Sequence, residues 1–377
     1  MKNTAYKLYA GFFNLFAHLP LQKKKAALLS PHMASFADSL GKMETEMQKR
    51  GFKTVRISGA DIKPAKLTLP ALLRMARFFT KGAFDLATAA VVFLNDNFMP
   101  MADLHFRREA VLTQLWHAEG AFKRFGLDID GLDPEVACRV RKGNEKLTYV
   151  VCSSESVAPV YASAFGVPPE KVLPLGSPRA DSYIRACKES NSEAFRKQYF
   201  GGTDKKVILY APTFRDDPAE NKKLLEHFDF DLFEKRFGDR YTLVLRLHPQ
   251  FNRGITIPEN VLNMTGFPDA DALIDACDLL ITDYSSICMD FALVGKPCLF
   301  YAFDLDRYSG TRNFYSDYKK YVPGPVAESF TALLSALEDP DTDRDKLHKF
   351  VEFNFGTPSG NAAEKIADAV IHAASAQ

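Results

Sequence analysis

Short apolar runs alternate along the chain with longer segments in which apolar residues recur with a helical period. Short runs are typical of parallel strands buried on both faces, and periodic segments are typical of amphipathic helices. Strands are predicted at residues 26–29, 54–58, 90–94, 111–115, 148–152, 172–175, 207–211, 242–247, 261–264, 279–282 and 298–301. Helices are predicted at residues 34–50, 67–87, 157–165, 180–187, 231–237, 269–277, 287–294, 327–337, 342–353 and 360–374. The alternation predicts an α/β protein with doubly wound parallel sheets.

The length of the chain indicates two domains. At 377 residues it exceeds the size at which a single hydrophobic core stops growing, ~250–300 residues. Polar stretches at residues 189–193 and 201–204 mark the predicted boundary. We therefore expect an N-terminal domain over residues 1–195 and a C-terminal domain over residues 196–355. A closing helix within residues 356–377 could pack back on the first domain.

Composition narrows the class of protein. A net charge of +1 gives no overall case for nucleic-acid binding. Six cysteines without C-x-x-C spacing indicate free thiols in a reducing cytosol. No apolar run reaches the ~20 residues that span a bilayer. No small-residue cleavage site follows the first apolar stretch, so no signal peptide is expected.

Two amphipathic segments nevertheless combine bulky apolar residues with basic ones. They cover residues 6–25 and residues 67–86. Such segments can lie in the headgroup layer of a membrane, with their basic side chains on anionic lipid. They can equally be helices that pack an apolar face on the protein core. The sequence pattern leaves both interpretations open.

Residues 276–301 are predicted to form a strand, a crossover helix and a second, parallel strand. Asp283 follows the first strand, and Ser285 and Ser286 lie where the helix would begin. A helix start at the carboxyl edge of a parallel sheet offers unpaired N–H groups to a phosphate or diphosphate. The alternative is that the serines only cap the helix and that Asp283 only holds the turn.

Four other predicted strand ends carry polar residues that suit the same kind of site. His117 could act as a general base, because imidazole titrates near neutrality, or it could be a buried structural histidine. The remaining residues at these ends could bind an anion or form ordinary surface pairs; they are Lys123, Arg179, Thr213, Arg215, Arg246 and His248. Five such ends on the same side of two sheets predict one shared ligand space.

Several blocks of sequence together resemble the CDP-glycerol glycerophosphotransferase family, the teichoic acid primases and polymerases. The first blocks are Q-L-W-H-A-E-G-A-F-K-R-F-G at 114–126, G-V-P-P-E-K-V-L-P-L-G-S-P-R-A-D at 166–181 and I-L-Y-A-P-T-F-R-D at 208–216. The others are R-L-H-P at 246–249, T-D-Y-S-S at 282–286, D-L-D-R-Y at 304–308 and R-N-F-Y-S-D-Y at 312–318. The resemblance covers nearly the whole chain and implies a GT-B architecture of two Rossmann-like domains that face a cleft.

The resemblance also implies the reaction. An acceptor hydroxyl attacks the β-phosphorus of CDP-glycerol, CMP leaves, and glycerol phosphate is transferred. His117 and His248 would be the essential pair, with His117 as the base toward the acceptor hydroxyl. His248, Arg246, Ser285 and Ser286 would neutralise charge on the donor diphosphate and the leaving CMP. Asp283, Thr213 and Arg215 would be further donor-binding residues. Lys123, Arg179 and Arg312 would support the acceptor or the phosphates.

Departures from the family pattern bear on how many units are transferred. Family polymerases carry H-G-T-P after the tryptophan, whereas His117 is followed here by Ala118, Glu119 and Gly120. Residues 120–123 are closer to the primases. Asn313 stands where many members have Gly, so the loop that follows is expected to be less permissive. These features favour limited transfer to a lipid-linked sugar over long-chain polymerisation.

The partners expected from the resemblance are CDP-glycerol and an undecaprenyl-diphosphate-linked saccharide, with the chain bound peripherally at the cytoplasmic face of the membrane. No cofactor or metal is expected, although Asp304 and Asp306 have the spacing of a weak metal motif. Three alternatives stay open: a CDP-ribitol-dependent enzyme, a nucleotide-sugar glycosyltransferase of the same fold, and an inactive membrane-bound scaffold.

Overall fold

The computed structural model describes residues 2–32, 36, 38–59, 68–215, 217–247, 257–259, 261–311, 313–340 and 343–376. The chain divides into two compact units. Unit 1 combines Met1–Asp181 with Phe353–Gln377, and unit 2 is Ser182–Glu352. Two helices carry the chain across these divisions, α7 (Pro178–Glu189) and α16 (Arg344–Phe355). Unit 2 is therefore one continuous insertion in unit 1.

Unit 1 is built on a parallel sheet whose described strands lie in the order β2-β1-β3-β4-β5-β6. The strands are β1 (Gln22–Ser30), β2 (Lys53–Ser58), β3 (Ala89–Leu94), β4 (Val111–Gln114), β5 (Tyr149–Val151) and β6 (Val172–Leu173). Its helices include α1 (Lys2–Phe16), α2 (Ser39–Lys49), α3 (Leu69–Arg77), α4 (Ala83–Ala87), α5 (Pro134–Asn144), α6 (Ala158–Phe165) and α17 (Ala362–Ser375). Short helices are η2 (Phe78–Gly82), η3 (Met99–Asp103), η4 (Gly126–Asp128) and η5 (Pro169–Lys171).

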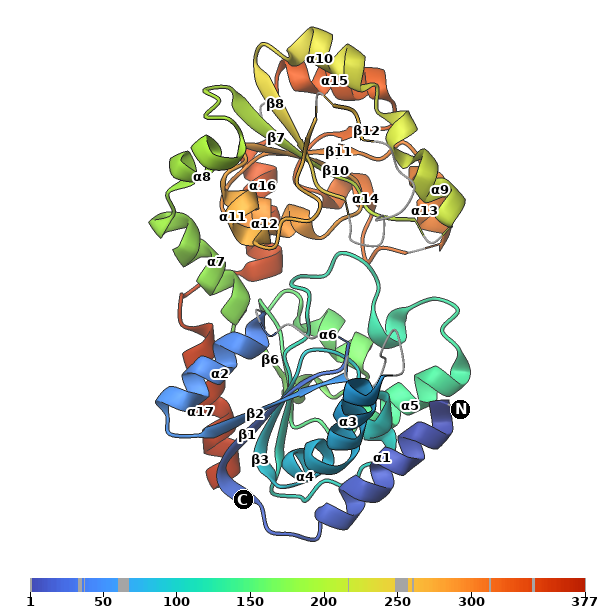
Figure 1. Cartoon of the computed structure of the whole chain (residues 1–377), viewed down its shortest axis with the longest axis vertical. Helices are drawn as coiled ribbons and strands as arrows, with labels where there is room; N and C mark the ends of the chain where they lie inside the picture. Colours follow the sequence, from blue (N-terminus) through green and yellow to red (C-terminus); the bar gives the residue numbers. More distant parts are fainter. Residues whose placement is uncertain are drawn as a thin grey trace. The chain divides into compact units, whose positions relative to one another are not determined.

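Helices cover both faces of this sheet (Figure 1). On one face, α2 and α17 pack against the alternate strand residues that point their way, among them Leu28, Phe93 and Val111. From α17 come the fully buried Ile366 and Val370. On the other face, α4 contacts β3, and α1 packs on α4. The central strands β3 and β4 are buried at every residue, which is why they read as continuous apolar runs in the sequence, whereas the edge strand β2 is partly exposed.

Unit 2 repeats the plan, with strands in the order β12-β11-β10-β7-β8-β9 and every pair parallel. These are β7 (Lys206–Ala211), β8 (Tyr241–Leu245), β9 (Leu262–Asn263), β10 (Leu279–Thr282), β11 (Cys298–Tyr301) and β12 (Val326–Ala327). The helices are α8 (Ser192–Tyr199), α9 (Pro218–Lys223), η6 (Leu224–His227), α10 (Phe230–Phe237), α11 (Ala270–Asp275), α12 (Ile287–Leu293), α13 (Leu305–Thr311), α14 (Tyr318–Tyr321) and α15 (Phe330–Glu338). Phenylalanines of α10 and leucines of α15 fill one side of the sheet.

The predicted α/β class with two doubly wound sheets is confirmed. Individual boundaries differ. The helix expected from residue 327 begins only at Phe330, because Val326 and Ala327 pair with β11 and Ser329 caps α15 through Ala332 N–H. The units divide after residues 181 and 352, whereas the expected domains end at residues 195 and 355. Residues 192–199 of that boundary region form helix α8.

Candidate active site

In unit 1, the carboxyl edge of the sheet carries His117. It lies three residues after β4, and its side chain is 41% exposed. The imidazole Nδ1 lies 3.2 Å from the backbone oxygen of Asn95 and 3.4 Å from a carboxylate oxygen of Asp96. Both neighbours accept hydrogen bonds, so the neutral ring carries its proton on Nδ1 and keeps a lone pair on Nε2. This is the arrangement of a general base held by an acidic partner.

The loop that follows β3 is itself fixed from two sides. The Asn95 side-chain amide donates to Asp38, at 2.6 Å, while the other oxygen of Asp38 caps α2 through Leu40 N–H. The Gln114 side chain, at the end of β4, donates to the backbone oxygen of Asp96 at 3.2 Å. The two groups that face His117 are thus anchored to neighbouring elements, which reduces the freedom of the imidazole ring.

Trp116 turns the backbone so that His117 faces outward. Its φ of 58° is in the left-handed region, which costs a non-glycine residue about 1–3 kcal/mol. The Trp116 N–H donates to the Gln114 side-chain oxygen at 2.9 Å, and its indole ring stacks on Phe125 with centroids 5.1 Å apart. The indole is buried while the next side chain reaches solvent. The strained backbone of Trp116 is therefore stabilised by the hydrogen bond to Gln114 and by the packing of the indole ring.

The remaining site residues predicted in unit 1 lie near this loop. Glu119 accepts from Ser177 at 2.8 Å and pairs with Arg179 at 3.5 Å, so Arg179 is engaged with a carboxylate. Lys123 is half-buried in the same loop. The loop is closed by the buried Asn354, whose side chain accepts from Ala121 N–H at 3.1 Å.

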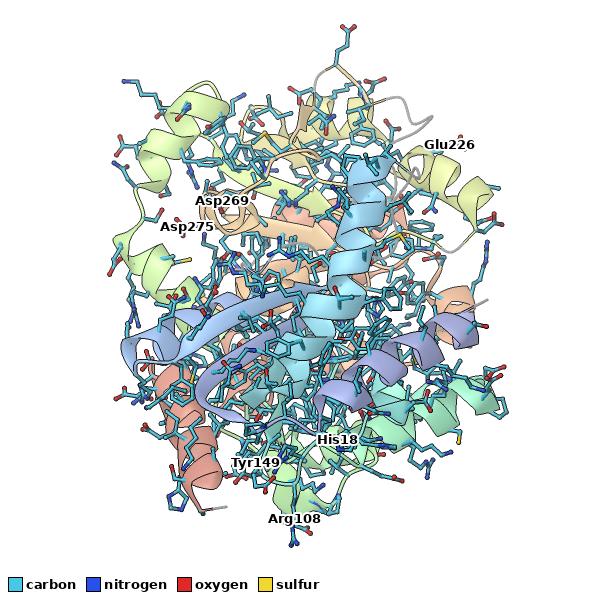
Figure 2. The ribbon with its side chains drawn as sticks, turned by 60° about the horizontal axis from the view of Figure 1, so that its bottom comes forward. His18, Arg108, Tyr149, Glu226, Asp269 and Asp275 are labelled. Atoms are coloured by element: carbon cyan, nitrogen blue, oxygen red, sulfur yellow. The ribbon has the colours of Figure 1, made fainter. Side chains whose placement is uncertain are left out.

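Figure 2 locates the opposite edge of the sheet. It labels His18 and Arg108, which precede β1 and β4, together with Tyr149, the first residue of β5. All three lie at the amino-terminal edge and appear together at the bottom of the view. His117 follows β4 and so belongs to the other edge, where ligands of parallel sheets bind. The exposed His18 and Arg108 are therefore suitable controls for site residues.

In unit 2, Arg215 is the centre of a buried cluster of charges. Its guanidinium donates to both oxygens of Asp304, at 2.8 and 2.9 Å, and to Asp283 at 2.9 Å. The Arg215 side chain is 8% exposed and that of Asp283 is 2% exposed. Burial alone would lower the pKa of the guanidinium, but the two aspartates raise it above its ordinary value. The cluster joins the loops that follow β7, β10 and β11.

Aromatic rings and backbone groups enclose this cluster further. The Tyr284 hydroxyl donates to Asp304 at 2.9 Å, and its ring stacks on Tyr308 with centroids 3.7 Å apart. Arg215 lies over the faces of both rings. Asp283 also accepts from the N–H of Thr213 at 2.8 Å. The arginine and aspartate predicted to bind the donor thus already satisfy each other inside the fold.

The serines of the T-D-Y-S-S block lie at the start of α12, as the sequence pattern predicts. Helix α12 begins at Ile287, and its first N–H is 3.4 Å from the Ser285 hydroxyl oxygen. Ser286 is exposed and makes no side-chain cap. Capping therefore comes from Ser285, and the hydroxyl of Ser286 faces outward. The side-chain oxygen of Thr213 is buried and has no hydrogen-bond partner among the described residues.

Arg246 is half-buried just after β8 and donates to the backbone oxygen of Phe267 at 3.1 Å. Burial lowers the pKa of its guanidinium, while Asp269 and Asp271 oppose that effect. An arginine still stays charged at neutral pH. His248 and Arg312, the two other residues predicted for this region, lie outside the described residues.

Two acidic residues at these centres were not singled out as site residues from the sequence. Asp96 belongs to a polar run, Asn95 to Asn97, directly after an apolar strand, and that position was the available signal. Asp304 was noted only as half of a weak metal motif; its carboxylate pairs with Arg215. Neither contact could be deduced from spacing, because the partners are far apart in the chain.

Comparisons with known proteins agree on the family. A teichoic acid glycerol-phosphate primase of Bacillus spizizenii is 33% identical over 293 residues, which cover 76% of this chain and 75% of that protein. A teichoic acid poly(ribitol-phosphate) polymerase of the same organism is 31% identical over 372 residues, which cover 97% of this chain and 59% of the relative. Its ribitol-phosphate primase is 29% identical, covering 97% of this chain and 94% of the relative.

Solved structures show the same fold. The wall teichoic acid polymerase TagF superimposes with a TM-score of 0.78 at 23% identity, covering all of this chain and 94% of that one. A UDP-GlcNAc 2-epimerase from Neisseria meningitidis gives a TM-score of 0.59 at 14% identity. The expected GT-B-like class is confirmed by the TagF likeness.

A family model extends the match along the sequence. The model described as CDP-glycerol:poly(glycerophosphate) glycerophosphotransferase matches residues 11–372. This span includes His117, Arg215 and the T-D-Y-S-S block. The chain belongs to the CDP-glycerol:poly(glycerophosphate) glycerophosphotransferase family.

Proposed function

We propose that the chain transfers a polyol phosphate from a CDP-polyol to a hydroxyl of a lipid-linked saccharide or of a growing polyol-phosphate chain. The acceptor oxygen forms a bond to the β-phosphorus, the bond from that phosphorus to the CMP oxygen breaks, and CMP leaves. The proton of the acceptor hydroxyl goes to His117 Nε2. Positioning and charge stabilisation supply most of the rate in such phosphoryl transfers.

The observation that carries the proposal is the pairing of His117 with Asp96. A carboxylate beside Nδ1 favours the imidazolium that forms when Nε2 takes a proton. The imidazole is held at Nδ1, and 41% of the His117 side chain is exposed, so a hydroxyl can approach the ring. A histidine with only a structural role has no need of an open nitrogen.

The donor is assigned to unit 2. We assign the diphosphate to the start of α12, with Ser286 and the backbone there as direct contacts and Arg246 as a neighbouring positive charge. The described geometry favours a different task for Arg215 and Asp283, which pair with each other and shape the loops around Thr213. His248 and Arg312 stay predicted members of the donor and phosphate-binding groups.

CDP-glycerol is the donor that we favour, and CDP-ribitol is the second candidate. Relatives named for glycerol phosphate and for ribitol phosphate match this chain at similar identity. The residues that follow His117, Ala118 to Gly120, differ from the H-G-T-P of the polymerases and still favour limited transfer, as in a primase. We also propose that the reaction needs no cofactor, because basic side chains and hydroxyls can hold the diphosphate.

A lipid-linked acceptor implies that the transfer takes place at a membrane surface. In the described part of the chain, no helix is long and apolar enough to cross a bilayer. We therefore propose peripheral binding at the cytoplasmic face. Both amphipathic segments expose leucines, but α1 also buries Tyr9 and Phe13 in the core, whereas the one buried residue of α3 is Ala71. Helix α3 is the better candidate for membrane contact.

The direct test is release of CMP from CDP-glycerol in the presence of a lipid-linked disaccharide, for the native chain and for His117→Ala. We expect the substitution to slow release by about 10²–10⁴-fold, the usual cost of losing a general base. His18→Ala is the matched control, since it removes an exposed histidine at the other edge of the same sheet. Equal rates for the two variants would reject His117 as the base.

The same assay separates the remaining alternatives. Release from CDP-ribitol alone would change the donor assignment, and the product mass reports whether one or many units were added. A product without the transferred phosphate would indicate a glycosyltransferase. A folded protein that neither binds nor consumes either CDP-polyol would be a scaffold, and the proposed function would then be wrong.

A further inference from the structure

The backbone just beyond His117 turns back into the interior of unit 1. We call residues 117–121 the His117 loop. Gly120 and Ala121 are buried, and Gly120 has a φ of 71°, in the left-handed region that favours glycine. Because buried backbone N–H groups cannot bond to solvent, those of Gly120 and Ala121 need acceptors within the protein.

Two buried side chains supply these acceptors. The Ala121 N–H donates to the Asn354 side-chain oxygen at 3.1 Å, and the Gly120 N–H donates to the Ser153 hydroxyl oxygen at 3.3 Å. The Ser153 hydroxyl in turn donates to the backbone oxygen of Asn354. Ser153 is 6% exposed, and Asn354 is fully buried. Together they form a clamp on two successive N–H groups, which we call the Ser153–Asn354 clamp.

The two members of the clamp come from distant parts of the chain. Ser153 follows β5, which pairs with β4, so it lies beside the end of the strand that His117 follows. Asn354 lies 201 positions further along, in the last turn of α16. Helix α16 begins in unit 2 and ends in unit 1, so the clamp is complete only when the chain has returned to unit 1.

The clamp supports a strained backbone from its carboxyl side. The left-handed φ of Trp116 persists only where the surrounding structure over-determines it. On the amino side, the Gln114 side chain holds the Trp116 N–H. On the carboxyl side, the clamp holds Gly120 and Ala121. His117 lies between these two supports, so the orientation of its imidazole depends on both.

We propose that Ser153 and Asn354 are positioning residues for His117, an inference that rests on the proposed transfer reaction. Both side chains are buried, so they act on the reaction through the loop rather than by touching a substrate. They hold the loop so that Nδ1 of His117 stays beside Asp96 while Nε2 stays open to the acceptor hydroxyl. A displacement of about 1 Å in such a group can cost about 10²-fold in rate.

The first measurement is steady-state release of CMP from CDP-glycerol by the full chain, with a lipid-linked disaccharide as acceptor. We expect Asn354→Leu to lower kcat by about 10–10²-fold and Ser153→Ala by about 3–10-fold, because the loop loses one or both of its acceptors. The KM for CDP-glycerol should change little, since the donor is assigned to unit 2. Ser153→Ala, the milder change, keeps the test decisive if Asn354→Leu does not fold.

Ser154→Ala is the matched control for Ser153→Ala. The Ser154 hydroxyl also donates to the returning segment, at the backbone oxygen of Phe353. Among the described residues, however, none of its hydrogen bonds is to the His117 loop. We therefore expect Ser154→Ala to keep the native kcat.

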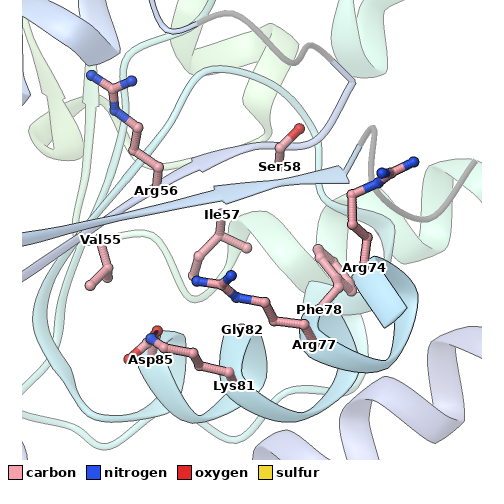
Figure 3. A pocket seen from close by; sticks show the side chains of 10 residues that line it. All are labelled: Val55, Arg56, Ile57, Ser58, Arg74, Arg77, Phe78, Lys81, Gly82 and Asp85. Carbon is pink, nitrogen blue, oxygen red and sulfur yellow. Dashed lines mark hydrogen bonds and ion pairs between the residues drawn. The ribbon is translucent and has the colours of Figure 1, made fainter. Parts of the chain in front are cut away.

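A second control tests for a general loss of stability. Asp85 lines a hollow of about 490 Å³ between β2 and the segment formed by α3, η2 and α4 (Figure 3). It pairs at 2.9 Å with Lys25, which is 2% exposed. Asp85→Asn breaks this buried ion pair in the same unit, near the far edge of the sheet from β4. It should lower the midpoint of urea denaturation but leave the kcat of the folded protein unchanged.

Hydrogen exchange measures the clamp without relying on catalysis. Mass spectrometry of fragments resolved to single residues reports the backbone amides of Gly120 and Ala121 in the ligand-free chain. We expect Ser153→Ala to speed exchange at Gly120 and Asn354→Leu to speed it at Ala121, each by about 5-fold or more, because one hydrogen bond is lost. Ser154→Ala should leave both amides as protected as in the native chain.

The outcomes separate this inference from the proposed function. If His117→Ala slows CMP release while both clamp variants keep the native kcat, the transfer stands and the positioning role is wrong. If His117→Ala keeps the native rate, the proposed function and the positioning role both fail, and the exchange data then show only whether the clamp orders the loop. A loss of kcat in Ser154→Ala or Asp85→Asn equal to that in Ser153→Ala would overturn the proposal, because it would show a general effect on stability.

Discussion

The surroundings of His117 and of Arg215 show two uses of the same kind of sequence position. Both residues follow a parallel strand at its carboxyl end, and both contact aspartates. The imidazole is held at one nitrogen and 41% exposed, whereas the guanidinium is 8% exposed and engaged with two carboxylates. A polar residue at a strand end can thus be an open side chain, as for His117, which we propose as the base, or a buried strut between loops, as for Arg215. Exposure and pairing separate the two.

Of the substitutions that test this comparison, Arg215→Ala is expected to have the largest effect, which is a loss of stability. Arg215→Ala leaves Asp283 and Asp304 as buried, uncompensated charges, so we expect the free energy of unfolding to fall by about 3–5 kcal/mol. Urea denaturation followed by circular dichroism measures it. Arg236→Ala is the control, because it breaks an exposed pair with Glu338 and should change the free energy of unfolding far less. Native stability in the Arg215 variant, together with lost donor affinity, would instead make Arg215 a ligand-binding residue.

Changing the partner of His117 has a smaller effect, and it falls on catalysis. We expect Asp96→Asn to lower kcat by about 10–10²-fold, less than the ~10⁴-fold loss seen for a buried triad aspartate, because Asp96 is partly exposed. The KM for the CDP-polyol and the free energy of unfolding should change little. Steady-state kinetics measure both constants. Asp130→Asn, at an exposed aspartate paired with Arg124, provides the control; an equal loss of kcat there would remove the special role of Asp96.

Replacing Thr213 should have the smallest effect on stability and the most specific effect on binding. Its buried hydroxyl has no partner among the described residues, so Thr213→Val should change the free energy of unfolding by less than about 1 kcal/mol. Thr282→Val is the counterpart, because that hydroxyl donates to Ala211 at 2.7 Å and its loss should cost about 1 kcal/mol. Calorimetric titration with the CDP-polyol should show weaker binding for the Thr213 variant; unchanged affinity would exclude Thr213 from donor binding.

The layout of the fold was predictable because parallel strands buried on both faces leave apolar runs in the sequence. The run 207–211 falls within β7, and 279–282 and 298–301 coincide with β10 and β11. The shortest strands were predicted less accurately. Strand β12 has only two residues, which a periodicity argument cannot detect, and the predicted strand at 261–264 is reduced to two paired residues.

The position of a candidate residue was predictable where it depends on the local order of the chain, as for His117 just after the end of β4. It was not predictable where chemistry depends on distant partners. Asp96 meets His117 only because β3 and β4 are neighbours in the sheet. Asp304 meets Arg215 because β11 and β7 both flank β10. Strand order, rather than any local pattern, creates these contacts.

The insertion of unit 2 within unit 1 sets an order for synthesis on the ribosome. A polypeptide emerges from its amino end, and units tend to fold as they are completed. Residues 182–352 have all been made before Ile366 and Val370 of α17 can reach the core beneath β3 and β4. The second unit in the sequence can therefore be complete while the first still lacks one of its covering helices. Until then, the apolar face that α17 covers is exposed, and the His117 loop lacks Asn354, whose side chain accepts from Ala121 N–H.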